Sequence, residues 1–202
     1  MDQASWLEES DGRFALGVRS LLTGSSFVES DPVLLVVRPW LDRIAEELGE
    51  TVHLGRLDRA DVVYLAKRES RHPLRMFSAI GRRLPAHATA LGKSILAQME
   101  DEQVREVVGT DPIRLTAKTL VDHADLVADL QGIRSRGWAF DREESAEGIH
   151  CSAVDLPLSP TSRNAISVSI PVYRLTPEVE HLAVDLLLEA RTRLLRRGIP
   201  AQ

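Results

Sequence analysis

Residues 51–69, TVHLGRLDRADVVYLAKRE, hold two short segments rich in valine and leucine, separated by the polar sequence at 58–60. Segments of this composition favour β-strands, and so short a connection indicates that the two strands pair antiparallel. The stretch therefore predicts an antiparallel sheet.

Later segments extend that sheet. Three apolar stretches are bounded by glycine, proline or polar residues: 138–142 (WAFDR), 148–158 (GIHCSAVDLPL) and 165–173 (AISVSIPVY). Near the N-terminus, Asp11-Gly12 is a hairpin signal within residues 6–16. Most strand neighbours are close enough in sequence for hairpins, and helices lie before, between and after them. The sequence predicts an α+β fold with a mainly antiparallel sheet of about six strands and flanking helices.

Capping residues mark the expected helices. Asp31 followed by Pro32 predicts a helix that stops at Gly49, and Pro39 inside it predicts a kink or a split. The other expected helices are 16–22, ending before TGSS, then 90–99, 101–108, 122–137, and a last helix capped by Thr176.

The composition excludes several classes of protein. Of the 202 residues, 44% are hydrophobic and 27% charged, and no apolar run is long enough to span a membrane. The net charge of −5 offers no broad basic face for nucleic acid. The first residues lack the pattern of a signal peptide, and the single cysteine, Cys151, excludes an internal disulfide. We therefore expect a cytoplasmic domain that contacts no membrane and supplies little of any DNA contact.

Residues 84–94, LPAHATALGKS, end like a phosphate-binding P-loop. His87 stands where that motif requires its first glycine, so we expect no nucleotide site. The stretch also predicts a helix N-terminus of small residues around Thr89, where the amides of Ala90 and Leu91 suit a small carboxylate. Tight packing on the sheet is the commoner reason for small residues.

Alternation in the strand at 165–170 places Ser167 and Ser169 on one face and the isoleucines on the other. A face of small hydroxyl residues either lines a polar cavity or lies exposed. In the preceding strand, Ile149 and Cys151 share a face. Asp141 ends a short apolar segment, but taken alone it is better explained as the start of the solvated run that follows.

The residues offer little for catalysis or metal binding. A catalytic Cys151 would need a base and a lowered pKa, but the adjacent His150 points to the opposite face. The histidines show no metal-ligand spacing. We expect no catalytic residue, metal or cofactor; a thiol nucleophile, or a zinc ion bound by His87, His150 or Cys151, remains an alternative.

Five segments in the same order resemble the effector-binding domain of the IclR family of bacterial transcriptional regulators: GRFALG, RPWLDRIAEELGETVHL, RLPAHATALGKSILA, IRSRGWAFDREESAEGIHCSA and AISVSIP. The resemblance covers nearly the whole chain and implies a profilin-like or GAF-like fold that binds a small effector on one side of a curved sheet. It also implies that residues 1–30 are a remnant of a DNA-binding wing and linker helix, and that 31–202 form the effector-binding domain. Most of the winged helix-turn-helix is then absent.

The resemblance further implies the residues around the effector, to which Thr89 is added from the small-residue turn: Met76, Leu84, Thr89, Ala90, Leu91, Asp141, Ile149, Cys151, Ser167 and Ser169. The amides of Ala90 and Leu91 and the two serine hydroxyls would bind a carboxylate or hydroxyl group. Asp141 would accept hydrogen bonds from the far end of the ligand, opposite an apolar wall.

We therefore expect a non-enzymatic sensing domain of an IclR-type regulator, binding a small organic effector such as a carboxylic or aromatic acid. The effector would alter the arrangement of a homodimer or homotetramer, and so the DNA binding of the absent module. Two alternatives remain: a small hydrolase-like or thiol enzyme using Cys151 with a histidine, and a pure oligomerisation module.

Overall fold

The structure is a computed structural model that describes residues 6–72, 78–158 and 163–199. Its centre is a curved sheet of six strands in the order β5-β4-β3-β8-β7-β6, with every neighbouring pair antiparallel. The strands are β3 Thr51–Asp58, β4 Asp61–Arg68, β5 Arg83–Pro85, β6 Ala139–Arg142, β7 Ile149–Leu156 and β8 Asn164–Pro171. The predicted α+β fold with an antiparallel sheet of about six strands is confirmed.

The hairpin of β3 and β4 contains a β-bulge. Leu54 lies opposite Ala66, whereas the next residue, Gly55, lies opposite Tyr64, so Leu65 is an extra residue in β4. An extra residue reverses which face the following side chains take. As a result Lys67 pairs with His53 and shares a face with it.

The helices are α1 Val18–Ser30, α2 Pro32–Leu48, α3 Ala90–Leu96, α4 Asp101–Val108, α5 His123–Arg136 and α6 Pro177–Arg197. The predicted N-caps are confirmed: the side chains of Asp31, Asp122 and Thr176 each accept a hydrogen bond from amides of the first turn. The break expected at TGSS was wrong, since α1 continues through it. Helix α2 is continuous through Pro39, so it is not split there, and a kink at Pro39 stays a prediction.

The reason why α1 continues through TGSS is local. The hydroxyl of Thr23, the first residue of TGSS, donates to the carbonyl of Arg19, so it is satisfied within the helix instead of ending it. In α2, a stripe of five buried side chains packs on the sheet and holds the helix together through Pro39. The bend of 74° falls instead between α1 and α2, where Asp31 caps the second helix.

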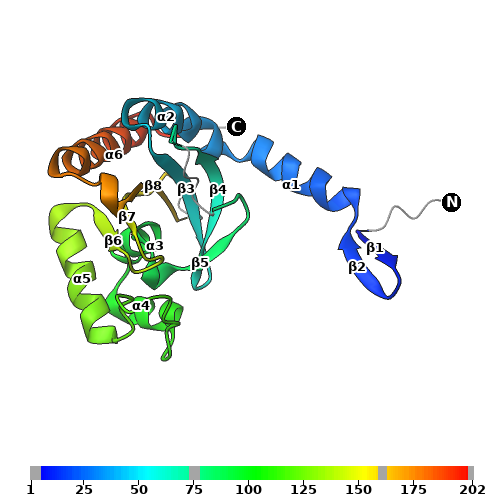
Figure 1. The fold of residues 1–202 in the computed structure, drawn as a ribbon, viewed down its shortest axis with the longest axis horizontal. Helices are drawn as coiled ribbons and strands as arrows, with labels where there is room; N and C mark the ends of the chain where they lie inside the picture. The colour runs from blue at the N-terminus through cyan, green and yellow to red at the C-terminus, as the bar shows by residue number, and fades with distance from the viewer. Residues whose placement is uncertain (1–5, 73–77, 159–162, 200–202) are drawn as a thin grey trace.

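The two faces of the sheet carry different cores. Helices α2 and α6 cover one face, over an apolar cluster that includes Val52, Leu54, Ile166, Val168 and Ile170 (Figure 1). Helix α3 packs on the other face, with α5 beside it, over a cluster with many small residues, including Ala90, Ala153 and Ala165. The second face therefore leaves space for polar side chains of the strands.

Helix α1 and a two-stranded hairpin, β1 Leu7–Ser10 and β2 Arg13–Leu16, extend away from the sheet (Figure 1). The predicted turn is confirmed, with φ of 51° at Asp11 and 72° at Gly12. No residue of either strand is buried, and neither is any residue of α1. The assignment of residues 1–30 to a wing and linker remains a prediction.

Across the described residues, no single helix is long and apolar enough to span a membrane, although the bent pair α1 and α2 together meets the criteria of length and composition.

Candidate functional site

The polar side chains of β8 lie inside the protein, on the side of the sheet that faces α3. Ser167 is 2% exposed and Ser169 4% exposed, while Ile166, Val168 and Ile170 belong to the core beneath α2 and α6. The predicted alternation of β8 is therefore confirmed. Because both serines are buried, the alternative of an exposed hydroxyl face does not apply.

The strand register extends this polar face across the sheet in two rows. The first row runs over four strands through Thr51, Ser169, Cys151 and Asp141, each directly opposite the next. The second runs through Lys67, His53, Ser167 and Ala153. Directly opposed residues have Cβ atoms roughly 5 Å apart. The two rows therefore form one compact polar surface, which we call the polar face; the thiol of Cys151 lies 3.2 Å from the hydroxyl oxygen of Ser169, within hydrogen-bonding distance.

The small-residue turn before α3 lies beside this face. The Thr89 hydroxyl oxygen accepts from the amide of Gly92 at 2.9 Å, which caps the helix. No residue within the described ranges accepts a hydrogen bond from the amides of Ala90 or Leu91. A Cβ on Gly55 would meet the Leu91 side chain at 3.0 Å, which places Leu91 over β3.

The Gly-Lys-Ser sequence has a structural explanation. A Cβ on Gly92 would lie 2.1 Å from the carbonyl oxygen of Ala86, so only glycine fits where these two backbones touch. The Ser94 hydroxyl donates to the carbonyl of Leu91. Packing therefore accounts for part of the small-residue pattern, as the commoner interpretation held.

Lys93 is the residue that sequence reasoning missed. Its side chain is 2% exposed, and Nζ donates to both carboxylate oxygens of Glu144 at 2.7 and 2.8 Å. Nζ also lies 2.8 Å from Oδ2 of Asp129 on α5, without hydrogen-bond geometry. A lone charge within the apolar run ALGKSILA was the available signal. Lys93 therefore ties α3 to α5 and to the turn that follows β6.

Asp141 stabilises the same turn after β6 through hydrogen bonds to its own side chain. It is fully buried, and its carboxylate accepts from the amides of Glu144 at 2.6 Å and Ser145 at 3.2 Å, and from the Ser145 hydroxyl. Burial raises the pKa of Asp141, although these hydrogen bonds oppose the shift. The structure thus gives Asp141 a role in the turn, and its contact with a ligand stays a prediction.

Three of the predicted residues remain to be placed: Leu84, Ile149 and Met76. Leu84 is half-buried on β5 and packs on the cluster beneath α3. Ile149 is half-buried at the start of β7, opposite Pro171. Met76 lies outside the described residues. Of the ten predicted residues, nine are thus placed, and those on β8, β7, β6 and α3 come together.

Cys151 is in no position to act as a nucleophile. Burial raises the pKa of its thiol well above the ordinary value, and nearby Asp141 adds to the effect. His150 faces the other side of the sheet, with Nε2 3.3 Å from a carboxylate oxygen of Glu180, and His87 Nε2 lies 3.0 Å from the carbonyl of Ile113. Within the described ranges no histidine hydrogen bonds to the thiol, and no three metal-binding side chains gather at one place.

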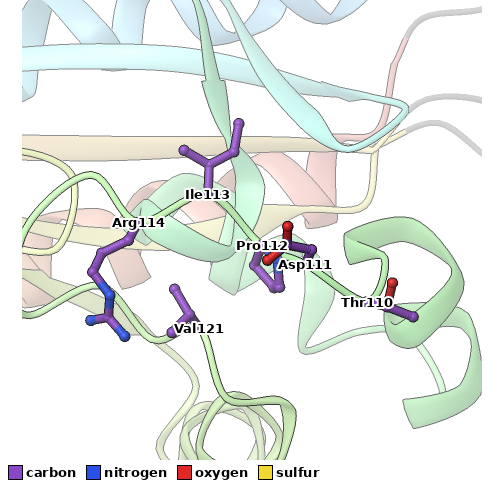
Figure 2. A pocket seen from close by; sticks show the side chains of 6 residues that line it. All are labelled: Thr110, Asp111, Pro112, Ile113, Arg114 and Val121. Carbon is purple, nitrogen blue, oxygen red and sulfur yellow. The ribbon is translucent and has the colours of Figure 1, made fainter.

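A hollow of about 370 Å³ lies elsewhere, on the loop between α4 and α5, lined by Thr110, Asp111, Pro112, Ile113, Arg114 and Val121 (Figure 2). None of the ten predicted residues lines it. Arg114 donates from Nη1 to the carbonyl of Thr119 at 3.2 Å, within its own loop. The hollow is open to solvent and made mostly by one short stretch, so we take the polar face as the candidate site.

The fold and the site define the class of this chain. It is an α+β domain built on one antiparallel sheet, with helices on both sides and one polar, buried face. Comparison identifies the family: the model for "Bacterial transcriptional regulator IclR C-terminal" matches residues 25–194. The chain belongs to the IclR family of bacterial transcriptional regulators, as its sequence motifs implied.

Individual relatives support this family assignment. The chain is 38% identical over 173 residues to the transcriptional repressor IclR of Escherichia coli (strain K12), covering 83% of this chain and 62% of that protein's length. The crystal structure of the Thermotoga maritima IclR superposes with a TM-score of 0.82 at 28% identity, covering 95% of this chain and 79% of the other. An IclR homologue from Microbacterium hydrocarbonoxydans, solved in complex with 4-hydroxybenzoate, superposes with a TM-score of 0.75 at 22% identity, covering 95% and 80%, and shows a shared fold.

Proposed function

We propose that this domain is the small-molecule-sensing part of an IclR-type regulator and that its effector binds on the polar face. The observation that carries the proposal is the burial of Ser167 and Ser169 beneath α3. Polar groups inside a protein are unfavourable unless they find hydrogen-bond partners. Ser169 already contacts the Cys151 thiol, and a carboxylate or hydroxyl of a ligand would supply further partners.

The surroundings of the serines suit a small organic acid. The amides of Ala90 and Leu91 are available as donors, and Leu84 and Ile149 supply apolar surface, with Met76 expected to join them. The complex of the Microbacterium homologue with 4-hydroxybenzoate supports an aromatic or other carboxylic acid as the class to test. The raised pKa of Cys151 argues against a thiol enzyme.

Sensing would act through the assembly of several chains. A ligand shifts an equilibrium only if it binds one arrangement more tightly than another. We propose that the effector favours one arrangement of a homodimer or homotetramer and so changes DNA contact by a helix-turn-helix outside these residues. The hairpin and α1 would connect the two parts. Such a regulator works where the chromosome lies, so a cytoplasmic location remains our prediction.

A pure oligomerisation module is the competing function. The side chains of Trp6, Phe14, Leu16 and Leu21 are each more than half exposed on the hairpin and α1, and apolar surface of this kind favours contact between chains. The two functions differ in whether a ligand binds at all.

Isothermal titration calorimetry with a panel of short carboxylic and aromatic acids tests the proposal. We expect at least one acid to bind the wild type, and we expect Ser169→Leu and Ala90→Trp to abolish that binding by placing a bulky side chain at the polar face. Ser152→Ala is the matched control, because Ser152 is buried on the opposite side of the same sheet. A stable oligomer together with an empty panel would favour the oligomerisation module instead.

A further inference from the structure

Two polar atoms of β3 on the polar face have no hydrogen-bond partner within the described part of the chain. The hydroxyl oxygen of Thr51 and Nδ1 of His53 are both buried, and neither has a partner among the described residues. Thr51 is 0% exposed and His53 1% exposed. A buried polar atom without a partner is unfavourable by roughly 1–3 kcal/mol, so such atoms indicate a missing water or ligand.

Both atoms adjoin the serines of the candidate site. Thr51 lies directly opposite Ser169, and His53 directly opposite Ser167. The other nitrogen of His53 is already engaged, since Nε2 lies 2.8 Å from the hydroxyl oxygen of Ser78. The imidazole is also stacked on Tyr64 with ring centroids 4.6 Å apart, which fixes its orientation. Both residues therefore belong to a fixed wall of the polar face.

The charges around this wall select an uncharged partner. Burial lowers the pKa of His53 to about 3, and the positive charge of Lys67 adds to the effect, so the imidazole is neutral. The ammonium of Lys67 already contacts the Ser78 carbonyl at 2.9 Å and Glu69 at 3.0 Å. A carboxylate buried against Thr51 would therefore compete with Glu69 for its counter-ion, whereas a hydroxyl would need none.

The structure assigns Thr51 and His53 to recognition of a hydroxyl group on the effector. The effector is then a hydroxy acid: its carboxylate binds beside the β8 serines, and its hydroxyl binds at β3. This inference rests on the proposed function and adds the part of the site that selects among acids. A hydroxyl both donates and accepts, as the Thr51 hydroxyl and a neutral imidazole require.

Calorimetry with acids that differ by one hydroxyl tests this assignment. The probes are benzoate with 3- and 4-hydroxybenzoate, and propionate with lactate. We expect the wild type to bind the better hydroxy acid roughly threefold to tenfold more tightly than its parent acid, as one net hydrogen bond implies. Thr51→Val, which keeps the side-chain shape, should bring that ratio close to one, and Thr51→Ser should restore it.

The matched control is Ser152→Ala. Ser152 is also a buried hydroxyl without a partner among the described residues, but it lies on the side of the sheet that faces α6, so its loss should leave the ratio unchanged. Thermal unfolding verifies that Thr51→Val is folded. Binding of acids with the same ratio in wild type and Thr51→Val, or no preference in the wild type, would overturn the assignment and leave a buried water as the partner of Thr51. No binding of any acid would instead refute the proposed function itself.

Discussion

Lys93→Met should destabilise the domain strongly and in a pH-dependent way. Methionine fills the volume of the lysine stem, so the main change is electrostatic: Glu144, whose side chain is 9% exposed, loses its ammonium partner. Removing one member of a buried ion pair destabilises a protein by about 3–5 kcal/mol. Asp129 is affected less, because its side chain is 26% exposed and it retains Arg136 at 3.5 Å. We expect a loss near the lower end of that range at pH 7.

The pH dependence follows from the carboxyl group of Glu144. Burial already raises its pKa above 4.5, and the charge and hydrogen bonds of Lys93 oppose that shift. Without Lys93 the folded-state pKa rises further, so the folded variant binds more protons than the unfolded chain between pH 4.5 and the raised pKa. Stability of the variant therefore falls as pH rises through that window, and its deficit against the wild type is largest above it.

Urea denaturation at pH 7.5 and pH 5 measures both effects. The double variant Lys93→Met, Glu144→Gln should recover most of the lost stability at pH 7.5, since no uncompensated charge remains. Lys118→Met is the exposed control: its side chain is 59% exposed, and its pair with Glu143 should contribute little. A deficit under about 1 kcal/mol at pH 7.5, far below the range for a buried pair, or a deficit that is equal at both pH values, would refute this reasoning.

Three further predictions concern packing, capping and reactivity. Gly92→Ala should cost about 1–3 kcal/mol through overpacking against Ala86, and a thermal melt lowered by less than about 2 °C would contradict the contact. Asp31→Ala should weaken the domain by at least the ~1 kcal/mol of a helix cap. Burial raises the Asp31 pKa, but Arg56 and the capped amides outweigh it and hold the pKa below 3.8. The stabilisation from this group is therefore present above pH 3.8 and is lost as pH falls through its lowered pKa, which urea titrations near pH 3 and pH 7 would reveal. Because burial raises its pKa, Cys151 should react with a thiol-specific disulfide reagent at pH 8 far more slowly in the folded than in the unfolded protein, and equal rates would show that the thiol is accessible.

Much of the fold could be read from local signals. Asp31, Asp122 and Thr176 cap helices through contacts with their own first turns, so sequence alone locates them. The alternation of β8 was equally plain, because one face is wholly aliphatic. These signals depend on neighbours within a few residues along the chain.

What sequence reasoning missed depends on distant contacts. Lys93 is buried only because Glu144, 51 residues later, comes beside it. Thr51 and His53 lie beside the serines only because β3 pairs with β8. Nothing in the sequence of β3 indicates that β8 is its partner. The continuation of α1 through TGSS was missed for another reason: serine and threonine favour both turns and helix-satisfied hydroxyls, and the sequence does not decide between them.

The β-bulge in β4 accommodates Leu65 without moving the charged residues that follow it. With Leu65 in place, Lys67 stands beside His53 and Arg68 reaches Asp42 on α2. Deleting Leu65 would remove the bulge but leave Ala66, Lys67 and Arg68 opposite the same residues of β3, so both charges would keep their sides of the sheet. The bulge thus allows two successive side chains, Leu65 and Ala66, to join the core beneath α2 and α6, which strict alternation along a strand would not permit.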